Sequence, residues 1–302
     1  MKDITLRQLR FLVETVRTGS LAGAASACHV TGPAIAQQLR LLEKAVGLPL
    51  LERGPEGQTP TEAGRILVAA AHRIEAELAT CTDTVVSLRK AESGHVTLGA
   101  VSTAKYFTPQ VLAHFQRTHP GIRVSMNIGN RREIIDRLEE YEIDLAIMGR
   151  APSRLEVEQE FVGDHPYAII APPDHPLVGA GPVAFSVVAK EPFLVREPGS
   201  GTRLHAEDLF ARAGLPPAYS MEISSNETIK QAVIAGLGVA LISEHTVAAE
   251  IHDGRLALLE VEGLPIMRQW LVVRMARRSV SPATQAMWDF FVTEAQALLP
   301  TP

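Results

Sequence analysis

The sequence predicts a small all-α domain at the N-terminus, one long helix after it, and then a larger α/β region. Two observations support this fold class. Apolar residues recur at helical spacing through most of the first 90 residues, and from Ser93-Gly94 onward strand-sized apolar runs alternate with helical segments. A chain of 302 residues also exceeds the usual size of one hydrophobic core. We therefore expect two or three domains.

The composition is that of a globular protein. Apolar residues make up 46% and charged residues 21% of the chain, and no apolar run reaches the length of a membrane span. The charged start, with Lys2 and Asp3, does not resemble a signal peptide, so we expect a cytoplasmic protein without a membrane partner. The two cysteines, Cys28 and Cys81, argue against a disulfide framework or a zinc site. The net charge of -5 does not exclude nucleic acid, because a local basic patch suffices.

The first 47 residues predict three short helices. Residues 4–18 carry apolar side chains on one face and end before Gly19. Ser20 can cap a short Ala-rich helix, and Thr31 stands at the N-cap of a third helix that runs to Gly47. Such a series, with a tight turn before the third helix, is typical of a helix-turn-helix, although a small helical bundle is the alternative.

A hairpin is predicted directly after the third helix. Leu50 and Leu51 anchor a strand, residues 54–57 (GPEG) supply the turn, and Thr59 begins the return strand. A hairpin in this position is a wing.

Residues 61–90 then predict one long helix. Its apolar residues alternate at spacings of three and four, as in a coiled-coil seam of about four heptads that could pair two chains. The predicted seam residues are Leu67, Ala70, Ile74, Leu78, Cys81, Val85 and Leu88. A long helix packed on its own domain is the alternative. Because Ala70 and Cys81 are small, we expect other surfaces to contribute to dimerisation.

The alternation of strands and helices after residue 93 predicts a mostly parallel sheet covered by helices. About 200 residues are available, enough for two lobes with a cleft between them, and the last helix is expected to pack on the first lobe. The predicted domains are residues 1–60, the linker helix 61–92 and the region 93–302. Within this region, lobe I comprises about 93–163 and 270–302, and lobe II about 164–269.

Long segments of the chain resemble the LysR-type transcriptional regulators. They are RQLRFLVETVRTGSLAGAASACHVTGPAIAQQLRLLEKAVGLPLLERG and TPTEAGRIL. Further segments resemble the regulators of Calvin-cycle (RuBisCO) operons within that family: GAVSTAKYFTPQVLAHFQRTHPGI, GNRREIIDRLEEYEIDLAIMGR, IIAPPDHPL, REPGSGTR and SSNETIKQAVIAGLGVALIS. The resemblance implies a winged helix-turn-helix, a linker helix and a two-lobed effector domain like that of periplasmic binding proteins.

The resemblance also implies a function. A regulator of this kind binds a dyad promoter site as a homodimer or a dimer of dimers, and a small metabolite between the lobes modulates it. Carbon-fixation genes are the expected target, and another metabolic operon is the alternative. RNA polymerase is a further partner that the resemblance implies. The third helix departs from the common family pattern at Gly32 and Ala36, which have no side chain that could hydrogen-bond a base.

The third helix carries the residues expected to contact double-stranded DNA. The N-terminal part of such a helix lies near base edges, while flanking basic groups bind phosphates. Gln37 is favoured for pairing with adenine and Gln38 for the backbone, since neighbours on a helix point about 100° apart. Arg40 and Arg53 are expected at phosphates or the minor groove; ion pairs with Glu43 or Glu52 are the alternative. The predicted DNA-binding residues are Ser20, Thr31, Pro33, Ala34, Gln37, Gln38, Arg40 and Arg53.

Polar side chains follow four predicted strands of the α/β region. Ligands in open α/β sheets bind at the carboxyl ends of strands, where the next helices present free amides. Hydroxyls, amides and cations there suit an anionic metabolite such as a phosphate ester. The clearest segment is PGSGTR at 198–203, although plain helix capping is its alternative. The predicted effector-binding residues are Ser102, Thr103, Lys105, Asn130, Arg131, Gly199, Ser200, Thr202, Arg203, Asn226 and Glu227.

Two other classes of protein are weighed against a regulator. A solute-binding protein would need only the two lobes, which leaves residues 1–90 without a role. An α/β enzyme would need an acid, base or nucleophile set in the cleft, and the sequence presents no such set. We therefore predict no catalytic residue, no metal ligand and no cofactor. A sugar phosphate or a reduced nicotinamide nucleotide is the effector that the resemblance implies.

Overall fold

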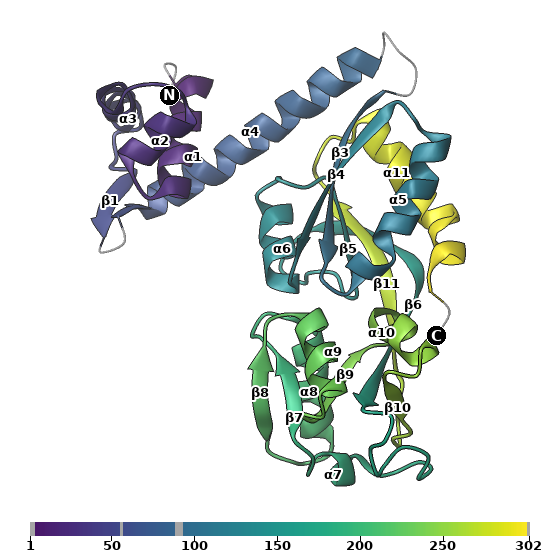
Figure 1. Cartoon of the computed structure of the whole chain (residues 1–302). Helices are drawn as coiled ribbons and strands as arrows, with labels where there is room; N and C mark the ends of the chain where they lie inside the picture. Colours follow the sequence, from purple (N-terminus) through teal and green to yellow (C-terminus); the bar gives the residue numbers. More distant parts are fainter. Residues whose placement is uncertain (1–3, 55–56, 88–92, 301–302) are drawn as a thin grey trace. The chain divides into compact units, whose positions relative to one another are not determined.

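The computed structural model describes residues 4–54, 57–87 and 93–300 (Figure 1). The chain forms two compact units, Met1–Cys81 and Thr82–Pro302. Each unit contains hydrophobic clusters of its own. In the described ranges, no helix is long and apolar enough to pass through a lipid bilayer.

The N-terminal unit is built on a helix-turn-helix. Its elements are α1 (Leu6–Thr18), α2 (Leu21–Ala27), α3 (Gly32–Val46), β1 (Leu51–Gly54), β2 (Gly57–Pro60) and most of α4 (Glu62–Ser87). The α1 helix ends at Gly19, whose φ of 65° lies in the left-handed region that glycine tolerates. The α2 helix begins after Ser20, whose Oγ accepts a hydrogen bond from the Gly23 amide at 3.0 Å. Gly23 permits the tight turn, because a Cβ there would lie 2.7 Å from the Thr18 Cβ.

One buried face holds α3 in place. Ile35, Leu39 and Leu42 are at most 5% exposed, and they pack with Phe11 and Leu12 of α1. Thr31 occupies the N-cap position in extended backbone geometry, although its side chain makes no capping hydrogen bond. The predicted helix-turn-helix is therefore confirmed, and the face of α3 opposite these three residues points away from its own core.

The predicted hairpin follows α3. Strands β1 and β2 pair in antiparallel register, with Leu51 opposite Pro60. The predicted turn residues Pro55 and Glu56 lie outside the described residues. The Gln58 amide donates a hydrogen bond to the Gly19 carbonyl at 2.7 Å. This bond attaches the hairpin to the end of α1.

One predicted seam residue of α4 also packs on its own domain. Leu67 is half-buried against the hydrophobic clusters of the N-terminal unit, in line with the alternative of a helix packed on its own domain, and the seam stays a prediction. An α-helix has 3.6 residues per turn, and a heptad pattern therefore drifts around its surface. The large apolar side chains that α4 exposes are Ile66, Ile74, Leu78 and Val85. Leu88, the last predicted seam residue, lies outside the described residues.

The second unit contains a mixed sheet whose described strands run in the order β4-β3-β5-β11-β6-β9-β7-β8, with β10 beside β6. Its strands are β3 (Gly94–Val101), β4 (Ile122–Gly129), β5 (Leu145–Met148), β6 (Val157–Ala171), β7 (Phe193–Arg196), β8 (Tyr219–Ile223), β9 (Val239–Ser243), β10 (Ala257–Leu259) and β11 (Ile266–Met275). Its helices are η1 (Ala104–Tyr106), α5 (Thr108–Thr118), α6 (Arg131–Glu139), α7 (Phe185–Val188), α8 (Gly201–Arg212), α9 (Asn226–Ile234), α10 (Glu244–His252), α11 (Pro282–Thr293) and η2 (Ala295–Leu298).

Parallel and antiparallel pairing divide this sheet. Strand β3 pairs in parallel with β4 and β5, and β7 pairs in parallel with β8 and β9, as the alternation of elements predicts. Strands β6 and β11 run antiparallel to each other and to β9 and β5, respectively. They pair from Ile266 opposite Tyr167 to Met275 opposite Val157, with a register shift between Trp270 and Leu271.

The shared strands β6 and β11 connect two lobes (Figure 1). Lobe I holds β3, β4 and β5 with the start of β6 and the end of β11, and its core includes Phe107, Phe115 and Trp270. Helix α11 packs into this core through Met287 and Phe291, which confirms the prediction for the last helix. Lobe II holds β7, β8, β9 and β10 with the remaining halves of β6 and β11.

Lobe II has a core on each face of its sheet. On β7, Phe193 and Val195 point to the cluster that contains Ala206 of α8. Leu194 points to the other cluster, which contains Ile229 of α9 and Val247 of α10. Because successive side chains on a strand alternate between faces, α8 covers one face of the lobe II sheet, and α9 and α10 cover the other.

Candidate functional site

The outward face of α3 presents polar and basic side chains. Thr31, Pro33, Gln37 and Arg40 are exposed, whereas Ala34 is half-buried. Ser20 is engaged as the cap of α2, which leaves its hydroxyl near the N-terminus of that helix. A helix with one face fixed in a core and the other free can enter the major groove of DNA.

The two glutamines of α3 differ in their surroundings. The Gln8 Nε2 donates to Gln38 Oε1 at 3.2 Å, and Gln8 also closes a capping box with Thr5 at the start of α1. Gln38 is thus held by its own domain. The exposed Gln37 side chain makes no hydrogen bond to another described residue. This difference is compatible with base contact by Gln37 and a role nearer the backbone for Gln38.

Two arginines of this unit, Arg40 and Arg53, have no carboxylate partner among the described residues. Within that part of the chain, the predicted alternative of pairing with Glu43 or Glu52 is therefore not formed. Glu43 instead accepts a hydrogen bond from the Leu50 amide at 2.9 Å. Residues 4–54 hold six Arg or Lys and three Glu. This segment, which holds the first three helices, therefore carries local positive charge in a chain that is acidic overall.

A pocket lies between the two lobes of the second unit. Its volume is about 580 Å³, within the range of sites that hold small-molecule ligands. The residues that line it are Val101, Ser102, Thr103, Arg131, Gly149, Arg150, Tyr167, Ser200, Gly201, Thr202, Leu204, His205, Asp208, Arg212 and Arg268. Five of the predicted effector-binding residues are among them: Ser102, Thr103, Arg131, Ser200 and Thr202.

Positive charge dominates the pocket. Its described lining contains four guanidinium groups and one carboxylate, Asp208. Arg131 donates to the carbonyls of Arg150 and Ala151 at 3.3 and 3.2 Å, while its buried Nε has no partner among the described residues. Burial, together with the neighbouring charges of Arg150 and Arg154, lowers the pKa of Arg131. An anion in the pocket would relieve this repulsion.

Hydroxyl groups from both lobes line the pocket. Tyr167 is buried and lines it together with Thr202 of lobe II and Thr103 of lobe I. Burial raises the pKa of Tyr167, so the phenol stays neutral and can donate. The edge of His205 packs on the Tyr167 ring at 4.6 Å. Burial and then the charge of Arg268 lower the pKa of His205 to about 4.

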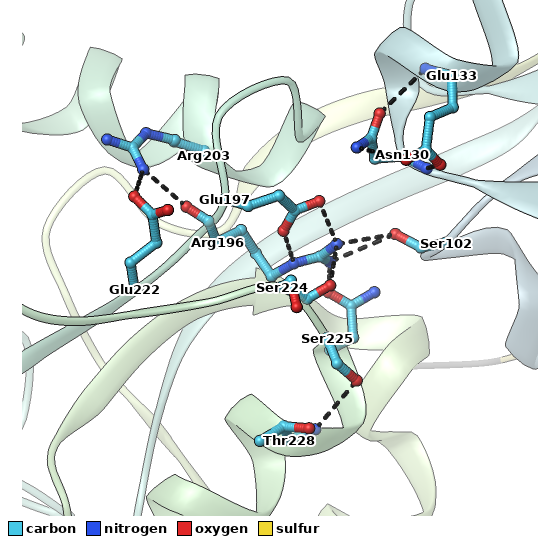
Figure 2. Close-up of polar contacts among 11 residues, drawn as sticks. Ser102, Asn130, Glu133, Arg196, Glu197, Arg203, Glu222, Ser224, Ser225 and Thr228 are labelled. Atoms are coloured by element: carbon cyan, nitrogen blue, oxygen red, sulfur yellow. Dashed lines mark hydrogen bonds and ion pairs between the residues drawn. The ribbon is translucent and has the colours of Figure 1, made fainter. Parts of the chain in front are cut away.

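Arg196 joins the lobes beside this pocket (Figure 2). Its side chain is 2% exposed and pairs with Glu197, with Nε to Oε2 at 2.7 Å. Both terminal nitrogens lie 3.3 Å from the Ser102 Oγ of lobe I, and one donates to Asn226 of lobe II. The Ser224 carbonyl accepts a further bond at 3.4 Å. Ser102 is therefore positioned by a buried arginine from the opposite lobe.

Arg203 lies outside the pocket lining. It donates to Glu222 at 2.5 Å and to the Arg196 carbonyl at 3.0 Å (Figure 2), and also to Glu207 at 2.8 Å. Its guanidinium also lies over the Tyr219 ring at 5.5 Å. These contacts satisfy the side chain within lobe II. The neighbouring Thr202 faces the pocket instead.

The remaining predicted effector residues also lie outside the lining. Asn130 caps α6 in a capping box with Glu133 (Figure 2). Gly199, with a φ of 94°, packs against Arg132, whose amide donates to the Gly199 carbonyl at 3.3 Å. Lys105 lies over the Tyr106 ring at 5.0 Å. The other two residues, Asn226 and Glu227, make contacts with Arg196 and Lys230, respectively.

A second group of charges lies where η1 of lobe I meets α9 and α10 of lobe II. Lys230 is 3% exposed, and its Nζ lies 2.8 Å from Glu250 and 2.9 Å from Glu227. The Tyr106 ring faces this ammonium at 4.7 Å, and its hydroxyl donates to Glu227 at 3.5 Å. The hydrogen bond from Lys230 lowers the pKa of Glu227. Every charge in this group has a partner within the chain.

Several pocket residues were missed by sequence reasoning. Arg150 lies two residues after the end of β5, so the rule of strand carboxyl ends could have found it. Asp208 and Arg212 lie one and two turns after Leu204 on α8, on the side that faces the pocket. Arg268 comes from the antiparallel strand β11, and no local pattern indicates it. In the described part of the chain, no group of His, Cys, Asp and Glu could hold a metal ion.

Two family models match the chain. The bacterial regulatory helix-turn-helix protein model of the lysR family matches residues 6–65, and the LysR substrate binding domain model matches residues 89–296. The HTH-type transcriptional regulator CbbR of Xanthobacter flavus is 47% identical over 98% of this chain and 90% of that protein. The RuBisCO operon transcriptional regulator of Allochromatium vinosum is 38% identical over 97% of each chain.

A solved structure is similar to the second unit. The regulatory domain of CcmR from Synechocystis PCC6803, in complex with 2-PG, has a TM-score of 0.64 and 36% identity. The match covers 66% of this chain and 96% of that chain.

Proposed function

Because the chain belongs to the LysR family of bacterial transcriptional regulators, we propose that it controls carbon-fixation genes in response to a small organic anion. The observation that carries the proposal is the lining of the interlobe pocket. Among the described residues it contains four guanidinium groups and several hydroxyls but one carboxylate. The similarity to a RuBisCO operon transcriptional regulator supports carbon-fixation genes as the target. The similarity to the CcmR regulatory domain in complex with 2-PG supports a small organic anion as the effector.

The proposed DNA contacts divide into base contacts and phosphate contacts. Gln37, Pro33 and Ala34 of α3 are proposed to contact base edges, with Thr31 at the entry of the helix. The phosphate contacts are assigned to Ser20, Gln38, Arg40 and Arg53, the last from the hairpin, which acts as a wing. Two copies of α3 in one dimer would read the two halves of a dyad site.

The proposed assembly is a homodimer or a dimer of dimers. The exposed apolar side chains of α4 supply one pairing surface, and residues 61–92 are assigned as a linker helix between residues 1–60 and the effector domain 93–302. Lobe closure on a ligand, in a fold like that of periplasmic binding proteins, would change the spacing of the paired helices. Contact with RNA polymerase stays a prediction from the family.

The effector site is tested by calorimetric titration of the full-length protein with 2-PG. We expect binding to the wild type and an affinity about tenfold lower for Arg150→Ala, the loss of one hydrogen bond between charged groups. Arg277→Ala is the matched control, since Arg277 is exposed, pairs with Glu156 and does not line the pocket. A wild type that binds neither 2-PG nor any other organic phosphate would refute the anion site.

The DNA interface is tested with two substitutions that should differ in kind. Gln37→Ala should cost about 1 to 3 kcal/mol and relax sequence preference at one operator position. Arg53→Ala should weaken binding to all sequences and reduce the salt slope by about one. Arg17→Ala is the control, because Arg17 already pairs with Glu14 at 2.6 Å. Identical behaviour of the first two variants would contradict the assignment.

A further inference from the structure

Two hydrogen bonds in series link the start of α1 to the side of α3. The Thr5 backbone amide donates to the Gln8 Oε1 at 2.9 Å, and the Gln8 Nε2 donates to the Gln38 Oε1 at 3.2 Å. Gln8 is 6% exposed, whereas Gln38 is half-buried. A buried side-chain amide needs a partner for its oxygen and another for its nitrogen, and Gln8 has both.

The direction of both bonds follows from the first donor. A backbone N–H can only donate, so the atom of the Gln8 side chain that faces Thr5 must be its oxygen. The other end of that amide is the Nε2, which can only donate as well. Gln38 must therefore turn its oxygen toward Gln8. This leaves the Gln38 Nε2, with its two hydrogens, as the free end of the Gln38 amide.

The free end of this amide lies at the border of the outward face of α3. Gln38 follows the exposed Gln37 and precedes the buried Leu39, and successive residues of a helix point about 100° apart. The Gln38 Nε2 makes no hydrogen bond to another described residue, and it is not fully buried. When such a helix lies in the major groove, a donor at its side faces the phosphates that border the groove.

We propose that Gln8 is a positioning residue for DNA binding, which fixes the Gln38 amide so that its Nε2 donates to a phosphate oxygen of DNA. The inference rests on the proposed function, because that function assigns Gln38 to the DNA backbone. A glutamine that rotates freely presents its oxygen as readily as its nitrogen, and a phosphate oxygen repels it. The buried Gln8 removes this unproductive orientation before DNA binds, so less side-chain freedom is lost in the complex.

The test reverses the direction of the bonds with Gln8→Glu. At pH 8 the new carboxylate is ionised, and both of its oxygens can only accept. One oxygen would keep the bond from the Thr5 amide, and the other would turn the Gln38 Nε2 inward and its Oε1 toward the DNA. Fluorescence anisotropy measures binding of the full-length protein to a random-sequence duplex of about 30 base pairs, because phosphate contacts do not depend on sequence. We expect an affinity at least about tenfold lower than that of the wild type, the equivalent of one hydrogen bond to a charged group.

Gln38→Met is the matched background, because it lacks the amide that Gln8→Glu is expected to turn. The direct effect of the new charge on DNA is present in both backgrounds, so the comparison cancels it. The loss of affinity caused by Gln8→Glu should be about tenfold smaller in the Gln38→Met background than in the wild type. Equal losses in the two backgrounds would overturn the inference, since a merely structural role for Gln8 does not depend on the Gln38 amide.

Urea unfolding of each variant checks that the N-terminal unit is folded under the binding conditions. Gln38→Glu is a second variant that leaves Gln8 and its bond to Thr5 in place. One oxygen of the new carboxylate would accept from Gln8 while the other faces the phosphate, so we expect a loss of at least about tenfold. Binding as tight as that of the wild type would overturn the inference. A wild type that fails to bind the duplex would instead refute the proposed DNA interface.

Discussion

The two faces of the lobe II sheet differ in whether the positive charges beside them have partners. On the face of α9 and α10, the buried Lys230 has two carboxylates within 2.9 Å and an aromatic ring above it. On the face of α8, the interlobe pocket adds two arginines of lobe I: Arg150 has no ion pair within the described chain, and Arg131 has a buried nitrogen without a partner among the described residues. Charges that are paired within the chain stabilise its folded state. Charges that lack a partner in a pocket are available to bind an anionic ligand.

The largest expected effect comes from removing the balanced charge. Lys230→Met should lower the free energy of unfolding by about 3 to 5 kcal/mol, because it removes the nearest cation from Glu250, a side chain only 8% exposed whose other partner, the exposed Arg255, lies 3.5 Å away. Arg268→Met, in the pocket, should change the free energy of unfolding by less than about 1 kcal/mol. Urea unfolding followed by circular dichroism measures both values. Similar losses for the two variants would remove the distinction between the two faces.

A second prediction uses the pH dependence of stability. His205 in the pocket has its pKa lowered to about 4, below the ordinary value of 6.5 that applies when the chain is unfolded. The unfolded chain thus binds the extra proton first, and stability present above pH 6.5 is lost as the pH falls toward 4. We expect a loss of roughly 1 to 2 kcal/mol between pH 7 and pH 5 from this residue.

His205→Gln should reduce the loss of unfolding free energy between pH 7 and pH 5. The difference between the pH dependences of the wild type and this variant isolates the contribution of the imidazole. Saturating 2-PG should also reduce it, because an anion offsets the arginine charges that lower the pKa of His205. A pH dependence that is identical in wild type and variant would place the responsible groups elsewhere.

The smallest expected effect concerns the aromatic ring over Lys230. Tyr106→Phe removes only the long hydrogen bond to Glu227, at 3.5 Å, and keeps the ring 4.7 Å from the ammonium. It should cost about 0.5 kcal/mol of unfolding free energy, whereas Tyr106→Ala should cost more because the cation–π contact is lost as well. Equal costs for the two variants would mean that the ring contributes nothing to the balanced face.

Local signals in the sequence were sufficient for much of the fold. Ser20 and Gly19 mark the turn between the first helices, and both act there as predicted. Ser102, Thr103 and Ser200 follow parallel strands, and the sheet brings them to one pocket. Helix caps and the positions that follow strands can be read from the sequence because both depend on neighbouring residues, while effector binding by these residues stays a prediction.

Other features depend on residues far apart in the chain. The first half of β6 escaped prediction, since Glu158, Glu160 and Asp164 interrupt its apolar pattern on the exposed face. Arg268 reaches the pocket only because β11 pairs with β6. Arg203 was selected for its place in a glycine-rich segment. Its neighbour Thr202 lines the pocket instead, whereas the Arg203 guanidinium is bound to Glu207 and Glu222 within lobe II.

The register shift at Trp270 and Leu271 has a consequence for how the molecule can respond. In the part of the chain that the structure describes, the crossings between the lobes run along β6 and β11, and these strands pair with each other over residues 157–167 and 266–275. Sliding one lobe along the other would break the hydrogen bonds between β6 and β11, whereas bending at the register shift would keep them. A ligand in the pocket can therefore change the angle between the two lobes, and the size of the ligand sets that angle.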